Sequence, residues 1–165
     1  MKILFVSLGC DKNLVDSEVM LGLLRDKGHE ITNDEAQAEV IVVNTCSFIH
    51  DAREESIQTI LEMAELKKNG ICRLLIVSGC LAEKYRDEVL EELPEVDAVV
   101  GTTAYDTICE VIDKSLAGER VQSFESTDRL PLVETRRVLT TGGYSSYLKI
   151  GEGCDKHCTY CIIPK

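Results

Sequence analysis

Three cysteines stand close together in the run from Gly151 to Cys161. Cys154, Cys158 and Cys161 follow the spacing C-x3-C-x2-C. A 4Fe–4S cluster normally takes four thiolate ligands, so three clustered cysteines would hold such a cluster and leave one iron open to a small molecule. The spacing therefore predicts an iron–sulfur site with one open coordination position.

Two other chemistries also use clustered cysteines. A structural zinc site could take His157 as its fourth ligand, but zinc ribbons and fingers usually pair two cysteine knuckles separated by a longer loop. Disulfides need an oxidising compartment, and the run from Met1 to Lys12 has too few apolar residues for a secretory signal. We therefore expect reduced thiols that bind metal, with His157 as a loop residue rather than a ligand.

Length and composition limit the class of protein. The 165 residues are 44% hydrophobic, which suits one domain of ordinary size with part of a second. No apolar stretch is long enough to cross a membrane, so we expect a cytoplasmic protein without membrane contacts. The formal charge of −11 argues against a grip on a nucleic-acid backbone, because such binding depends on Lys and Arg.

Residues 1–118 alternate between apolar runs and helix-like repeats. This pattern predicts an α/β fold with a flavodoxin-like, doubly wound parallel sheet covered by helices on both faces. Five strands are expected, at residues 3–6, 29–32, 40–43, 74–77 and 98–100. Helices are expected at residues 14–27, 51–69, 82–93 and 105–116. The second helix would begin with a capping box formed by Asp51 and Glu54.

The pattern changes after residue 118. Residues 119–143 predict a linker, with a short strand near residues 120–124. Residues 144–150 have strand character and run directly into the first cysteine motif. We interpret residues 144–165 as the start of a second domain that is truncated after its cysteine loop.

Three further cysteines each follow a predicted strand. Cys10 follows the first strand, Cys46 the third and Cys80 the fourth. The carboxyl ends of parallel strands share one edge of the sheet, where ligands bind, so these thiols can meet in space. Gly9 and Gly79 would let the backbone approach a bulky cluster. The alternative is three ordinary half-buried cysteines in turns.

The last two cysteines lie elsewhere in this prediction. Cys72 precedes the fourth strand and would lie at the opposite edge of the sheet from Cys80, roughly 25 Å away at about 3.3 Å per residue. Cys109 belongs to the apolar stripe of the last helix, where a free cysteine behaves as a small hydrophobic residue. We expect both to have packing roles.

These motifs resemble a known family. The C-x3-C-x2-C spacing with Tyr160 before the last cysteine resembles the signature of radical S-adenosylmethionine enzymes. Two three-cysteine sets in one chain resemble the methylthiotransferases, and the run Ser7 to Glu18, SLGCDKNLVDSE, is similar to that family's N-terminal motif. Asn44-Thr45-Cys46 and Ser78-Gly79-Cys80 also stand where its pattern expects them.

The resemblance implies two 4Fe–4S clusters, one on Cys10, Cys46 and Cys80 and one on Cys154, Cys158 and Cys161. The second would cleave S-adenosylmethionine to a radical that abstracts a substrate hydrogen, and the first would carry the sulfur that is added as a methylthio group. Tyr160 corresponds to an aromatic residue beside the cofactor adenine, although a packing role fits equally well.

Relatives of this kind continue into a radical S-adenosylmethionine barrel and a TRAM domain. We therefore expect the 165 residues alone to be catalytically silent, because the groups that would position cofactor and substrate are missing. An unpaired strand at residues 144–150 would favour self-association or disorder.

The substrate expectation also comes from the resemblance. The run after Cys10 is similar to the branch that modifies an aspartate of a small-subunit ribosomal protein, with a sulfur donor that the residues do not identify. The tRNA branch typically carries Gln-Met-Asn after its first cysteine, and this chain lacks that run. Modification of a tRNA adenosine is therefore the alternative rather than the main expectation. A flavodoxin-like electron-transfer module and a zinc-stabilised interaction domain are alternatives of a different class.

Overall fold

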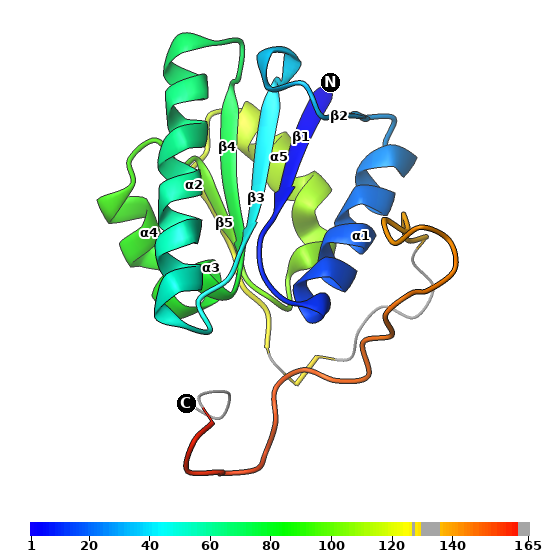
Figure 1. The fold of residues 1–165 in the computed structure, drawn as a ribbon. Helices are drawn as coiled ribbons and strands as arrows, with labels where there is room; N and C mark the ends of the chain where they lie inside the picture. Colours follow the sequence, from blue (N-terminus) through cyan, green and yellow to red (C-terminus); the bar gives the residue numbers. More distant parts are fainter. Residues whose placement is uncertain (127, 130–135, 162–165) are drawn as a thin grey trace.

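A six-stranded sheet forms the centre of the fold, and each pair of neighbouring strands is parallel. The computed structural model describes residues 1–126, 128–129 and 136–161. The spatial order is β2-β1-β3-β4-β5-β6, which is the flavodoxin-like order with one strand added. The strands are β1 (Lys2–Ser7), β2 (Glu30–Thr32), β3 (Val40–Thr45), β4 (Leu74–Gly79), β5 (Ala98–Val100) and β6 (Val121–Ser123). The predicted fold class is confirmed, and the short strand expected near residues 120–124 is β6 (Figure 1).

Helices cover both faces of this sheet (Figure 1). One face is covered by α2 (His50–Asn69), α3 (Cys80–Tyr85) and α4 (Asp87–Glu92), and the other by α1 (Asp11–Asp26) and α5 (Ile108–Leu116). Two short 3₁₀ turns, η1 (Glu35–Gln37) and η2 (Tyr105–Thr107), complete the element order. None of the helices within the described ranges combines the length and apolar character of a membrane span.

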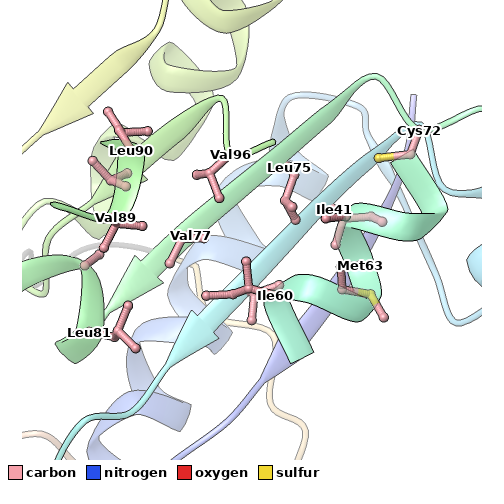
Figure 2. Close-up of a cluster of buried hydrophobic side chains, with 14 of the residues drawn as sticks. Ile41, Ile60, Met63, Cys72, Leu75, Val77, Leu81, Val89, Leu90 and Val96 are labelled. Atoms are coloured by element: carbon pink, nitrogen blue, oxygen red, sulfur yellow. The ribbon is translucent and has the colours of Figure 1, made fainter. Parts of the chain in front are cut away.

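Alternation along the central strands divides the core into two layers. Ile41 and Val43 of β3 face α2, whereas Val40 and Val42 belong to the layer under α1 and α5. Figure 2 shows the first layer, where Ile60 and other side chains of α2 pack on β3 and β4. All six residues of β3 and of β4 are buried, as expected for strands covered on both faces.

Two details of the predicted helices are wrong. The helix expected at residues 82–93 is two helices, because the backbone of Arg86 takes a positive φ of 37° between α3 and α4. The Arg86 side chain donates to the carbonyl of Glu83 and lies over the Phe124 ring, contacts that no helical repeat reveals. The capping box is also absent, since α2 begins after Ile49 without a side-chain cap and Asp51 lies in its first turn.

The strand expected at residues 144–150 does not form within the described part of the chain. Tyr144 lies in a turn, and residues 145–150 pair with no strand of the sheet. A strand needs a neighbouring backbone, and these residues instead reach α1 through side chains such as Lys149. Residues 127, 130–135 and 162–165, which belong to the predicted linker and second domain, lie outside the described residues.

The end of β4 provides a test of backbone crowding. Gly79 has a φ of 90°, and a Cβ there would collide with the Asn44 side chain and lie 2.5 Å from the Thr45 carbonyl oxygen. Gly118 has a similar φ of 94° but no atom within 4 Å of an ideal Cβ. We expect Gly79→Ala to lower the free energy of unfolding by about 3 kcal/mol and Gly118→Ala by only about 1 kcal/mol. Denaturant titration measures both, and equal losses would contradict the crowding argument.

Candidate metal centres

The first cysteine set lies just beyond three aligned strand ends. Ser7 of β1 is opposite Asn44 of β3, and Asn44 is opposite Ser78 of β4. Cys10 lies three residues after Ser7, and Cys46 and Cys80 lie two residues after Asn44 and Ser78, respectively. Because β1, β3 and β4 are neighbours and parallel, all three cysteines lie at the carboxyl edge of the sheet. The predicted placement of this set is therefore confirmed.

Contacts and charges show that these thiols are close together. A Cβ at Gly9, next to Cys10, would lie 3.0 Å from the Cβ and 3.5 Å from the Sγ of Cys46. Burial raises the pKa of the Cys80 thiol, and the nearby Cys46 and Cys10 raise that pKa further, whereas the positive charge of Lys12 lowers it. Cys46 and Cys10 thus influence the ionisation of Cys80, as expected for groups that share one site.

The three thiols differ in their exposure to solvent. Cys46 is only 5% exposed, Cys80 is half-buried and Cys10 is exposed. The set therefore has a closed side at β3 and an open side at the start of α1. A bound group would be reached from the side of Cys10.

Asn13 connects the loops that carry these cysteines. Its side chain is 2% exposed, and its Nδ2 donates to the carbonyl oxygens of Thr45 at 2.8 Å and Leu8 at 3.4 Å. Its Oδ1 lies 3.6 Å from the Cys80 Sγ and accepts from that thiol. One buried amide therefore contacts the loops after β1, β3 and β4. The sequence-based prediction missed Asn13, although it lies in the run from Ser7 to Glu18 that carried the family resemblance.

The backbone of Cys46 has an anchor of its own. The hydroxyl of Ser56 accepts from the Cys46 amide at 3.0 Å, and it lies 2.9 Å from the Cys46 carbonyl oxygen. Ser56 is fully buried on α2. Buried backbone polar groups need hydrogen-bond partners. The Ser56 hydroxyl provides one for the amide and one for the carbonyl of Cys46 where the chain leaves β3, and this fixes Cys46 at the base of the site.

The chemistry of the donor atoms limits what this set could bind. A tetrahedral zinc ion with Zn–S bonds of about 2.3 Å would bring its sulfur ligands to within about 3.8 Å of one another. The Sγ atoms of Cys10, Cys46 and Cys80 do not all lie within 4.8 Å of one another. Three thiols with glycines beside two of them are a donor set that suits an iron–sulfur cluster, because such clusters prefer thiolate ligands.

The second cysteine set lies in an irregular loop. Cys154 and Cys158 are exposed and Cys161 is partly buried. The amide of Lys156 donates to the Cys154 Sγ at 3.5 Å, and the Cys161 amide donates to the Cys158 carbonyl at 3.1 Å. These contacts fold the loop only locally, so the structure does not gather this set as it gathers the first. Tyr160, the predicted neighbour of the cofactor, is 90% exposed.

The remaining cysteines lie where packing roles predict. Cys72 is buried at the amino end of β4, opposite the end that precedes Cys80, and its Sγ donates to the Leu74 carbonyl at 3.3 Å. Burial raises the pKa of Cys72 and of Cys109, which keeps both thiols protonated. Cys109 packs against the layer under α1 and α5. Neither is near the strand ends that carry the first set.

Comparison with known proteins gives one family match and several relatives. Residues 2–101 match the family described as "Uncharacterized protein family UPF0004". A protein of Lachnoclostridium phytofermentans named "Ribosomal protein uS12 methylthiotransferase RimO" is 70% identical over 165 residues, which are 100% of this chain and 38% of the relative. Proteins with the same name from Symbiobacterium thermophilum and Acetivibrio thermocellus are each 51% identical over 99% of this chain, and the chain covers 34% and 37% of them. The chain thus spans between a third and two fifths of the length of these relatives.

The role of Asn13 can be tested without any metal. Asn13→Ala would leave the buried Thr45 carbonyl without its partner, and we expect the free energy of unfolding to fall by about 2 kcal/mol. The matched control is Asn69→Ala, which removes an exposed hydrogen bond to the Glu65 carbonyl at the end of α2 and should cost less than about 0.5 kcal/mol. Urea denaturation followed by circular dichroism measures both. A loss at Asn13 no larger than at Asn69 would exclude the connecting role.

Proposed function

The chain belongs to the UPF0004 protein family, and on that premise we propose that it contributes two iron–sulfur sites to a methylthiotransferase that acts on ribosomal protein uS12. The observation that carries this proposal is the convergence of Cys10, Cys46 and Cys80 around Asn13 at the carboxyl edge of the sheet. These residues lie inside the family match, and the relatives that match nearly the whole chain carry the methylthiotransferase name.

In this proposal, Cys10, Cys46 and Cys80 hold the first 4Fe–4S cluster. When bound, the cluster would supply an open iron that carries the sulfur to be transferred. The protein's part is to present thiolates, since cysteine binds metal in its deprotonated form. Burial keeps Cys80 protonated in the free chain because it raises the pKa of this thiol, and the nearby Lys12 opposes that effect. Lys12 therefore favours the form of Cys80 that binds iron.

Cys154, Cys158 and Cys161 would hold the second 4Fe–4S cluster, with S-adenosylmethionine as the ligand of its open iron. Their short spacing lets one loop wrap around a cluster, and the loop's exposed thiols are accessible for loading. Tyr160 presents an exposed ring between two of these ligands, and such a ring can stack on an adenine. The structure of the loop as described is compatible with this role.

The substrate class follows from the relatives, whose printed name is a uS12 methylthiotransferase. An acidic chain with a formal charge of −11 fits a protein substrate with a basic surface better than a nucleic acid. Modification of a ribosomal protein also agrees with an enzyme of the cytoplasm.

Iron and acid-labile sulfide analysis after anaerobic reconstitution tests the two sites. We expect roughly eight irons per chain, falling to about four in the variant Cys10→Ala/Cys46→Ala/Cys80→Ala. The matched control is Cys72→Ala/Cys109→Ala, which removes the two packing thiols and should retain about eight irons. About four irons in both the unchanged chain and the triple variant would eliminate the first cluster. Zinc in place of iron would favour a structural metal site.

Mass spectrometry tests the substrate. Purified uS12 and tRNA are each incubated with the complete protein, S-adenosylmethionine and a reductant. We expect a methylthio group on an aspartate of uS12, and none on tRNA. Methylthio-adenosine in the absence of modified aspartate would overturn the substrate assignment while leaving the cluster sites intact.

A further inference from the structure

A buried group of charges joins α1 to the segment that leads into the second cysteine set. The Lys149 ammonium lies 2.6 Å from Oδ1 of Asp16, and these side chains are only 5% and 7% exposed. Lys149 also forms an ion pair with Glu152, and the other carboxylate oxygen of Glu152 pairs with Lys12. Two cations and two carboxylates therefore neutralise one another, and Lys12, whose side chain is 36% exposed, lies at the rim of the group. We call these four residues the α1 charge network.

The network stands between the two cysteine sets. Lys12 is two residues after Cys10 and influences the pKa of Cys80. Its partner Glu152 is two residues before Cys154. In Figure 1 the segment runs along α1 toward the start of that helix, and its red end then extends beyond the carboxyl edge of the sheet. A single ion pair thus links the loop of the first set to the loop of the second.

The preceding part of the segment is also fixed on α1. The Glu18 carboxylate is 2.8 Å from the Arg137 guanidinium and accepts from the amide and hydroxyl of Thr140 at 2.6 and 2.8 Å. Gly22 lets the backbone come close, because a Cβ there would collide with the carbonyl oxygen of Arg136. Residues 136–152 therefore follow α1 from its middle to its start, and the α1 charge network is the last attachment before the cysteines.

A network of buried charges is an expensive way to hold a segment, since ions lose their hydration on burial and apolar side chains of similar size often stabilise as well or better. What charges supply is a specific position, because each ion must meet its own partner. Lys149 meets partners on three elements: Asp16 on α1, Glu152 on its own segment, and the ring of Tyr105 in η2, whose centroid is 5.2 Å from the ammonium. Burial raises the pKa of Asp16 to about 6, and Lys149 opposes this effect.

We propose that Lys149 is a positioning residue that fixes the loop of Cys154, Cys158 and Cys161 beside the site of Cys10, Cys46 and Cys80. The importance of this position for group transfer rests on the proposed function. If both sites act on one substrate atom, they must be held at a fixed separation. The attachment itself does not depend on either cluster.

The test uses the metal-free chain, so that it does not depend on cluster loading. Four proteins are compared: the unchanged chain, Lys149→Met, the exchange variant Asp16→Lys/Lys149→Asp, and the control Lys114→Met. Lys114 lies in the last turn of α5, where it is exposed and pairs with Glu110. The control Lys114→Met therefore removes a lysine charge that is not part of the network. The exchange variant restores opposite charges in case Lys149→Met destabilises the chain by leaving two carboxylates buried without their cation.

Two measurements are made on each protein. Amide hydrogen exchange reports the attachment of residues 145–152, and a short bis-maleimide followed by mass spectrometry reports cross-links between the Cys10 peptide and the peptide of Cys154 to Cys161. Both ends are accessible, since Cys10, Cys154 and Cys158 are exposed. Circular dichroism confirms that the sheet remains folded.

We expect Lys149→Met to accelerate exchange in residues 145–152 by roughly tenfold or more and to reduce the cross-link by a similar factor. The exchange variant should recover part of both signals, and Lys114→Met should change neither. Unchanged cross-linking in folded Lys149→Met, or an absent cross-link in the unchanged chain, would overturn the positioning role. The iron analysis of the reconstituted protein judges the proposed function separately, because it counts clusters irrespective of where the loop lies.

Discussion

The register in which β1, β3 and β4 pair is the constraint on which the placement of the first cysteine set depends. Ser7, Asn44 and Ser78 are aligned across the three strands, so the chain leaves all of them at the same level and on the same edge. Hydrogen bonding in a parallel ladder fixes this level, because a shift of one residue would turn every buried side chain to the opposite face. The buried residues of β3 and β4 alternate between two separate layers, which makes such a shift unfavourable. The core therefore places cysteines that are more than thirty residues apart in the sequence, and no contact between the cysteines themselves is needed.

The second constraint is that α1 has buried polar residues on the sides that do not face the apolar layer. Asn13 and Ser17 contact the strand ends through hydrogen bonds, including one from the Asn44 amide to Ser17 at 2.8 Å. Asp16 and Glu18 are 5% and 1% exposed and meet the segment of residues 136–152. A helix covered only by the sheet would leave these carboxylates in water. Because α1 is enclosed by both the sheet and this segment, its polar residues have partners, and the same helix contacts the surroundings of both cysteine sets.

The parts of this structure that follow from short-range patterns could be predicted, and those that depend on partners distant in the sequence could not. Apolar runs identified the strands, and the rule that ligands gather at carboxyl strand ends brought Cys10, Cys46 and Cys80 together. At the break, the Arg86 side chain lies over the distant Phe124 ring, a contact that the apolar repeat through this region does not reveal. Residues 144–150 alternate like a strand, but their polar side chains reach α1 instead. Asn13 was missed for a related reason, since a single amide has no pattern and becomes visible only through the three loops that it contacts.

In the proposed function, the two cysteine sets would hold their clusters by opposite means. A set spread over seventy residues can converge only if the fold is already formed, and the buried anchors at Asn13 and Ser56 keep it formed without metal. A set with spacings of three and two residues needs no folded core to converge, because one short loop can close around a cluster. In the free chain, Cys154 and Cys158 of this set are exposed and Cys161 is partly buried. Metal binding should therefore cost little conformational entropy at the first set and more at the second, where the loop must become ordered.

The compact motif lacks a defined location, since a loop that closes on itself does not fix its position relative to the rest of the fold. The contacts of residues 136–152 with α1 supply that location, and Lys149, whose side chain is only 5% exposed, lies just before this loop rather than within it.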